Sequence, residues 1–67
     1  MSPSRLKTVI KRLRTERGLT QVDLAKRAKV TQAYVAKIEG GDRVNPSLPV
    51  LKRLAKALGV PVTVLLE

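Results

Sequence analysis

The connection between two short helical segments, residues 20–28 and 31–39, constrains the fold of this chain most, because it consists of Lys29 and Val30 alone. Helices joined so tightly must cross at close range, which requires a small side chain early in the first of them, and Ala25 supplies it. The turn needs one residue with a positive φ, and Lys29 occupies that position although glycine would adopt the conformation more easily. Val30 follows as the apolar anchor of the turn. The pattern predicts a helix-turn-helix.

Further helical segments are indicated by start signals, stop signals and apolar stripes of helical period. Residues suited to cap helices are Ser4, Thr20, Thr31 and Ser47, and residues suited to end them are Gly18, Gly40, Gly41 and Gly59. The longest stripes consist of Leu6, Val9, Ile10 and Leu13, and of Leu48, Leu51, Leu54, Ala55 and Leu58. We expect an all-α fold, a compact five-helix bundle, in a single domain over residues 1–67. The expected helices span about 4–17, 20–28, 31–39, 47–58 and 61–66.

Composition limits how this domain is held together and what it binds. The 67 residues include no cysteine and no histidine, so disulfides are excluded, and neither a metal nor another cofactor is expected. The chain has 14 Lys and Arg against 5 Asp and Glu, and its net charge of +9 indicates a polyanionic partner. No apolar run approaches the ~20 residues that span a bilayer, and the start lacks the apolar core of a secretory signal. We therefore expect a cytoplasmic, nucleoid-associated protein with no membrane partner. Without a phosphate-binding glycine loop or a telling carboxylate pair, an enzyme is not expected.

The segment 31–39 presents a face that suits the major groove of DNA. At about 100° per residue, Val35 and Ile38 share one side and are expected to face the core. The opposite side consists of Gln32, Ala33, Ala36 and Lys37. Glutamine can pair bidentately with adenine, lysine can reach guanine or phosphate, and alanine can touch a thymine methyl group. The same four residues also suit an ordinary solvent-exposed helix face, because alanine favours helices and polar side chains are readily solvated.

The order of these signals resembles the Cro/repressor-type (XRE-like) helix-turn-helix family of bacterial and phage transcriptional regulators. The resemblance rests on Arg14, Gly18-Leu19-Thr20-Gln21, Leu24-Ala25, Val30-Thr31-Gln32, Ile38-Glu39-Gly40-Gly41, Pro46-Ser47-Leu48 and Leu58-Gly59-Val60, and it covers residues from about 5 to 67. Two positions depart from the family pattern. Lys29 replaces the commoner turn glycine, and Gly40 stands where many members have an asparagine near the DNA backbone.

The resemblance implies a lambda-repressor-like fold in which further residues contact the DNA backbone. These residues are Thr20, Gln21, Tyr34, Arg43 and Asn45. Gln21 starts a helix, where free N–H groups attract phosphate, and the resemblance implies that its side chain is braced against Gln32. It also implies a partly buried ion pair between Arg14 and Glu39, with a structural role.

The function expected from this resemblance is sequence-specific binding of double-stranded DNA by a transcriptional regulator. We expect a repressor that acts as a homodimer on a palindromic operator, with Val62, Val64 and Leu66 at the dimer interface. Two alternatives stay open at this point. A DNA-binding antitoxin or restriction-controller protein would work with a separate partner polypeptide. A basic module that binds RNA or an acidic protein belongs to another class, and the single aromatic residue, Tyr34, argues against RNA, which is usually read by stacking on aromatic side chains.

Overall fold

The computed structural model describes residues 3–42 and 44–66, and within the first helix the side chains of Pro3 and Ser4 lie outside this description. The described residues form five helices and no strand, which confirms the expected all-α class. In chain order they are α1 (Pro3–Glu16), α2 (Gln21–Ala28), α3 (Gln32–Glu39), α4 (Leu48–Leu58) and α5 (Thr63–Leu66). The predicted cap at Ser4 falls on an undescribed side chain, and a single domain over residues 1–67 stays a prediction.

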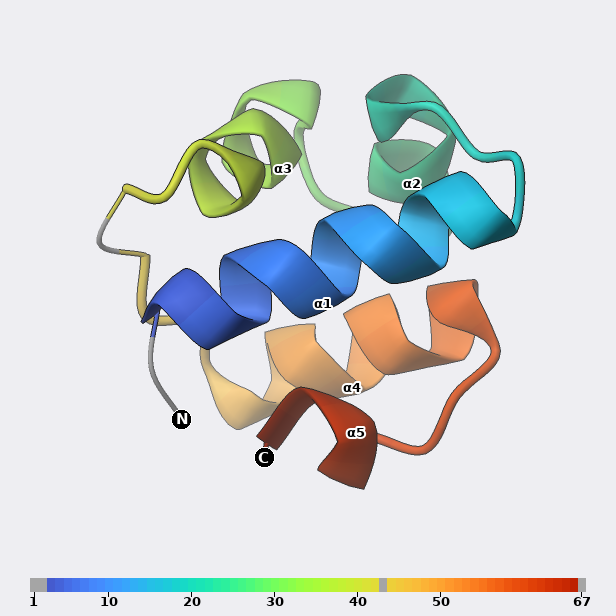
Figure 1. Cartoon of the computed structure of the whole chain (residues 1–67). Coiled ribbons are helices and arrows are strands. Elements are labelled where there is room, and N and C mark those ends of the chain that lie inside the picture. Colours follow the sequence, from blue (N-terminus) through green and yellow to red (C-terminus); the bar gives the residue numbers. More distant parts are fainter. Residues whose placement is uncertain (1–2, 43, 67) are drawn as a thin grey trace.

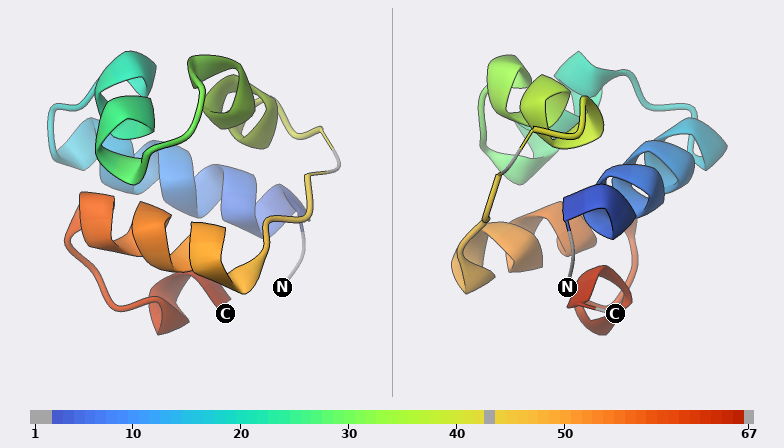
Figure 2. Two further views of the ribbon diagram at one scale, coloured as in Figure 1. Left: turned by 180° about the vertical axis from the view of Figure 1, so that it is seen from behind. Right: turned by 60° about the vertical axis from the view of Figure 1, so that its left-hand side comes forward.

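In Figure 1, helix α1 runs across the middle of the view, in front of the place where α2 contacts α4. The helix-turn-helix, α2 and α3, lies on one side of α1, and α4 with the short α5 lies on the other. Seen from behind, α2 and the turn that follows it lie above α4 (Figure 2). Contacts of α2 with both α3 and α4, and of α1 with both α3 and α5, close the arrangement.

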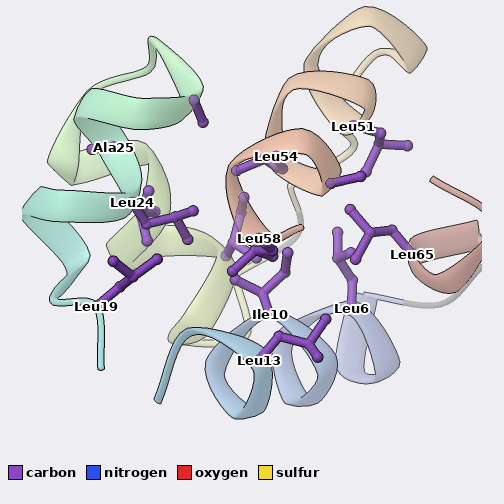
Figure 3. Close-up of a cluster of buried hydrophobic side chains, with 14 residues drawn as sticks. Leu6, Ile10, Leu13, Leu19, Leu24, Ala25, Leu51, Leu54, Leu58 and Leu65 are labelled. Atoms are coloured by element: carbon purple, nitrogen blue, oxygen red, sulfur yellow. The ribbon is translucent and has the colours of Figure 1, made fainter. Parts of the chain in front are cut away.

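One cluster of buried side chains joins all five helices (Figure 3). Leu6, Ile10 and Leu13 enter it from α1 and meet the leucines of α4. The small residues of α2, Ala25 and Ala28, are buried, which allows the close crossing that the sequence predicted. The full cluster consists of Leu6, Ile10, Leu13, Leu19, Leu24, Ala25, Ala28, Val35, Ile38, Leu51, Leu54, Ala55, Leu58 and Leu65.

Three of the predicted caps start helices in the structure. Thr20 forms a reciprocal capping box with Asp23: the Asp23 N–H donates to Thr20 Oγ1 at 3.0 Å, and the Thr20 N–H donates to Asp23 Oδ2 at 2.9 Å. This hydrogen bond from the Thr20 backbone is the main reason that the pKa of Asp23 lies below its usual value. Thr31 accepts from the Tyr34 N–H, and Ser47 accepts from the Val50 N–H. The caps have extended backbones, so these helices begin one residue later than expected.

The ends of the first four helices share one hydrogen-bond pattern, and only one of them lacks glycine. Gly18, Gly41 and Gly59 have positive φ after α1, α3 and α4, and Lys29 has φ 57° and ψ 45° after α2. At each end the next residue donates its N–H back to the last turn, as Val30 donates to Ala25 O at 3.0 Å. The prediction that Lys29 adopts a positive φ is confirmed. A residue with a Cβ in this conformation costs about 1–2 kcal/mol.

One expectation about an apolar residue is wrong, and the start of one helix differs from the approximate boundary expected. Leu48 was expected in the stripe of α4, but its side chain is 49% exposed, because it starts the helix and only the later turns reach the core. The fifth helix was expected from residue 61, yet it begins at Thr63. The backbone bonds from Val64 to Pro61 O and from Leu65 to Val62 O span three residues, as in a tight turn that leads into a helix.

Candidate nucleic-acid interface

The outward side of α3 is a continuous exposed face anchored by two buried residues. Val35 is fully buried and Ile38 is 2% exposed, so they fix the rotation of the helix about its axis. The four residues on the opposite side, Gln32, Ala33, Ala36 and Lys37, are all exposed. The helical projection therefore predicted correctly which side of α3 faces away from the core. Contact of these residues with bases stays a prediction.

A hydrogen-bonded ion pair fixes the C-terminal end of α3 to α1. Arg14 donates from Nε to Glu39 Oε2 at 2.7 Å and from Nη2 to Glu39 Oε1 at 2.9 Å, a bidentate geometry that favours arginine over lysine. A third donor, Arg14 Nη1, lies 2.7 Å from the backbone oxygen of Leu19. The Glu39 side chain is only 4% exposed. The partly buried pair that the family resemblance implied is therefore present.

Gln21 joins this network from the start of α2, which corrects one expectation. Its Nε2 donates to Glu39 Oε1 at 3.3 Å, so the side chain is braced against Glu39 and not against Gln32. The reason is geometric: Gln21, the first residue of α2, meets Glu39, the last residue of α3, whereas Gln32 is the first residue of that helix. The network therefore holds the N-terminus of α2 and the C-terminus of α3 in one fixed arrangement.

The pKa of Glu39 reflects the same arrangement. Burial acts to raise this pKa, but hydrogen bonds from Arg14 and Gln21, together with the positive charges of Arg14 and Lys11, outweigh burial and lower it below its usual value. The hydrogen bond to Glu39 is likewise the main reason that the pKa of Arg14 is raised. Both groups are thus charged at neutral pH.

The remaining predicted DNA-contact residues lie at both ends of α3. Thr20 is exposed at the start of α2, and Asn45 is exposed in the loop after α3. Tyr34 is half-buried against the core, and burial raises the pKa of its phenol while the nearby charge of Arg53 opposes that shift. Arg43 lies outside the described residues.

The residues predicted for a dimer interface differ in exposure, and their place in an interface stays a prediction. Val62 and Val64 are half-buried and pack against the core, whereas Leu66 is 40% exposed. Between them in the sequence, Leu65 is 2% exposed and points toward Leu6 and Leu51 (Figure 3). Val62 precedes α5, and within the helix Val64 and Leu66 are two residues apart and so point to different sides.

Sequence reasoning missed two lysines that lie beside this interface. Lys7 and Lys11 line a hollow of about 510 Å³ between α1 and the end of α3, where Glu39 also lies. The Lys7 side chain passes Gly41 so closely that a Cβ at residue 41 would lie 3.3 Å from Lys7 Cδ. Their spacing of one helical turn was a signal in the sequence. Only the packing of α1 on α3 shows that this turn faces the loop after α3.

Comparison with known proteins gives consistent matches over most of the chain. The Helix-turn-helix family matches residues 10–65. The immunity repressor protein of Bacillus phage phi105 is 52% identical over 54 residues, which is 81% of this chain but only 37% of that relative's length. Among solved structures, the N-terminal DNA-binding domain of SinR from Bacillus subtilis has a TM-score of 0.86 at 34% identity, over 92% of this chain and 90% of that one. The restriction-modification controller protein C.AhdI from Aeromonas hydrophila has a TM-score of 0.84 at 34% identity, over 91% of each chain.

Proposed function

The chain belongs to the helix-turn-helix family, and on that premise we propose that it is a transcriptional regulator that binds double-stranded DNA in a sequence-specific way. The relatives named above are repressors, regulators or controllers and not enzymes, in agreement with the expectation of a non-enzymatic role. The observation that carries the proposal is the exposed face of α3, which combines one amide, one cation and two small side chains on a helix held in place from behind. A protein that acts on operators would work in the cytoplasm, at the nucleoid.

The outward face of α3 supplies the base contacts. Gln32 pairs with the N6 and N7 atoms of adenine, and Lys37 reaches guanine or a phosphate. Ala33 and Ala36 keep the helix backbone close to the bases and contact thymine methyl groups. Each good base contact discriminates against the wrong base by about 1–3 kcal/mol. A face with so few polar side chains leaves much of the affinity to backbone contacts.

The backbone contacts come from residues around the ends of α3. Gln21 and Thr20 place the N-terminus of α2, with its free N–H groups, against a phosphate. Asn45 and Arg43 meet the same strand from the loop after α3, and Tyr34 adds its phenol from the half-buried side of the helix. The bracing of Gln21 by Glu39 supports this assignment, because it fixes the N-terminus of α2 before DNA arrives.

Repression by a two-fold dimer on a palindromic operator is the finer part of the proposal. Two copies would place their α3 helices in successive major grooves, with half-sites ~34 Å apart. Leu66 is the exposed member of the predicted dimer residues, and Val62 and Val64 would contribute their uncovered edges. Sedimentation at several protein concentrations measures this directly, and a monomer at every concentration, with and without DNA, would contradict the dimer.

Selection of bound duplexes from a random pool tests the DNA-binding proposal. The wild type should enrich a palindromic motif, and Gln32→Ala should lose preference at one base position of each half-site by about 1–3 kcal/mol. Lys52→Ala is the matched control, because Lys52 is exposed on α4 and outside the outward face of α3. Its motif should stay unchanged. Equal recovery of all duplexes by the wild type would refute sequence-specific binding.

A controller of a restriction-modification system is the second candidate role. It is favoured by the similarity to C.AhdI, which extends over 91% of both chains. This role, or that of an antitoxin, requires a separate partner polypeptide. The genes next to this one distinguish the roles. A neighbouring gene for a restriction endonuclease would support the controller, and one for a toxin would support the antitoxin. If neither gene is present, the repressor role is favoured.

A further inference from the structure

A cationic hollow lies outside the proposed DNA-reading face, where the end of α2 and the turn approach α4. Its volume is about 420 Å³. Its lining consists of Ala57 and four cations, Arg27, Lys29, Arg53 and Lys56. The view from behind shows the turn after α2 directly above the second half of α4 (Figure 2, left). Residues far apart in the sequence meet here, so only the tertiary structure reveals the cluster.

The cations of this hollow form no ion pair with the part of the protein that the structure describes. Among the described residues, no carboxylate lies within ion-pair distance of any of the four cations. Asp23 lies one helical turn before Arg27 and is engaged in the capping box with Thr20, and the charge of Arg27 is a lesser cause of its lowered pKa. Cations grouped in this way repel one another, and a bound polyanion would relieve that repulsion.

The backbone fixes one cation of the hollow directly and sets the position of another. Arg53 Nε donates to the backbone oxygen of Ala28 at 3.1 Å, which fixes its guanidinium at the end of α2. Lys29 occupies a left-handed backbone position, while the other described residues with positive φ are all glycine. A side chain retained at a strained position indicates a role for that side chain. The guanidinium of Arg53 and the backbone of Lys29 are thus fixed where the end of α2 meets α4.

The location of the hollow indicates which polyanion it meets. The backbone contacts proposed above, through Gln21 and Asn45, lie at the C-terminal end of α3. The hollow lies at the other end of this helix. Lys29 precedes the first residue of α3, and the charge of Arg53 acts to lower the pKa of Tyr34 in its first turn. In helix-turn-helix proteins the N-terminal residues of the recognition helix contact the base edges in the major groove. A cationic group beside this end of α3 therefore lies close to the phosphates that border the groove.

We propose that this hollow, formed by Arg27, Lys29, Arg53 and Lys56, binds DNA backbone phosphates beside the N-terminal end of α3. The inference rests on the proposed DNA-binding function and adds a second phosphate site to it. The site carries no base readout, so it strengthens binding to every sequence equally.

The test compares two double variants that remove the same charge. Lys29→Gly with Lys56→Ala empties half of the hollow, and glycine suits the left-handed position, so folding should be retained. Lys26→Ala with Lys52→Ala removes two exposed lysines that do not line the hollow. Circular dichroism checks that both variants fold. Affinity for the selected duplex and for a random duplex is then measured across salt concentrations.

The hollow variant should show a shallower salt dependence than the control, by about 1–2 in the slope of log K against log salt. When the salt concentration is raised fourfold, the control should therefore lose roughly 4 to 16 times more affinity than the hollow variant. This ratio should be the same for both duplexes. Equal slopes for the two double variants would overturn this inference and leave sequence-specific binding intact. A wild type that binds no duplex would instead refute the proposed function and this site with it.

Discussion

Replacing Glu39 by glutamine removes one charge from the buried network that joins α1, α2 and α3. In the wild type, the carboxylate accepts two hydrogen bonds from Arg14 and one from Gln21, and its side chain is 4% exposed. Glutamine keeps one oxygen as an acceptor but turns an amide N–H toward the guanidinium. Arg14, only 15% exposed, then retains its charge without a counter-ion.

The expected loss of stability is large for so small a domain. A hydrogen bond to a charged group contributes about 1.5–3 kcal/mol, so Glu39→Gln should lower the free energy of unfolding by about that amount. Glu39→Ala leaves the arginine charge unpaired and should cost about 3–5 kcal/mol. At 0.05–0.15 kcal/mol per residue, a chain of 67 residues has roughly 3–10 kcal/mol in total. The alanine variant is therefore expected to be partly or fully unfolded.

Urea unfolding followed by circular dichroism measures these differences, and its pH dependence isolates the carboxylate. Because the pKa of Glu39 is lower in the folded chain, its contribution is fully present above the unfolded-state pKa, about 4.3. The contribution is lost as the pH falls through the lower folded-state value. Between about pH 5 and pH 3 the wild type should lose more stability than Glu39→Gln.

A double-mutant cycle provides the control. Arg14→Met combined with Glu39→Leu removes both charges. The double variant should therefore lose about 2 kcal/mol less stability than the sum of the losses measured for Arg14→Met and Glu39→Leu alone. The reasoning would be refuted if Glu39→Gln unfolded within ~0.5 kcal/mol of the wild type and had the same pH dependence below pH 5.

Three further pairs of substitutions test the local structure by thermal or urea unfolding. Lys29→Gly should be neutral or stabilising by up to about 1 kcal/mol, because relief of left-handed strain exceeds the entropy that glycine adds to the unfolded chain. Lys29→Val should destabilise the domain instead. The opposite order of stabilities would argue against the positive φ of residue 29. Leu65→Ala should cost about 2–5 kcal/mol and Leu66→Ala less than about 0.5 kcal/mol at low protein concentration; equal costs would contradict the described orientation of α5. Thr20→Ala should cost about 1 kcal/mol and Thr20→Ser much less, and identical stability of the two would show that the cap contributes nothing.

The sequence by itself determined the helices and the outward face of α3. Local signals suffice for this: Thr20, Thr31 and Ser47 cap helices whatever packs around them, and spacing alone separates Val35 and Ile38 from the exposed face. The connection through Lys29 and Val30 was equally decisive, because a two-residue link between helices allows few geometries.

Only the tertiary structure decided which side chains meet across helices. The apolar character of Leu48 and Leu65 is the same in the sequence, yet one is exposed and the other buried, because burial depends on where neighbouring helices end. Gln21 bonds to Glu39 because the crossing of α2 and α3 brings those ends together. The cationic hollow arises for the same reason. Distances between helices are set by packing of the whole core, and no local pattern in the sequence specifies them.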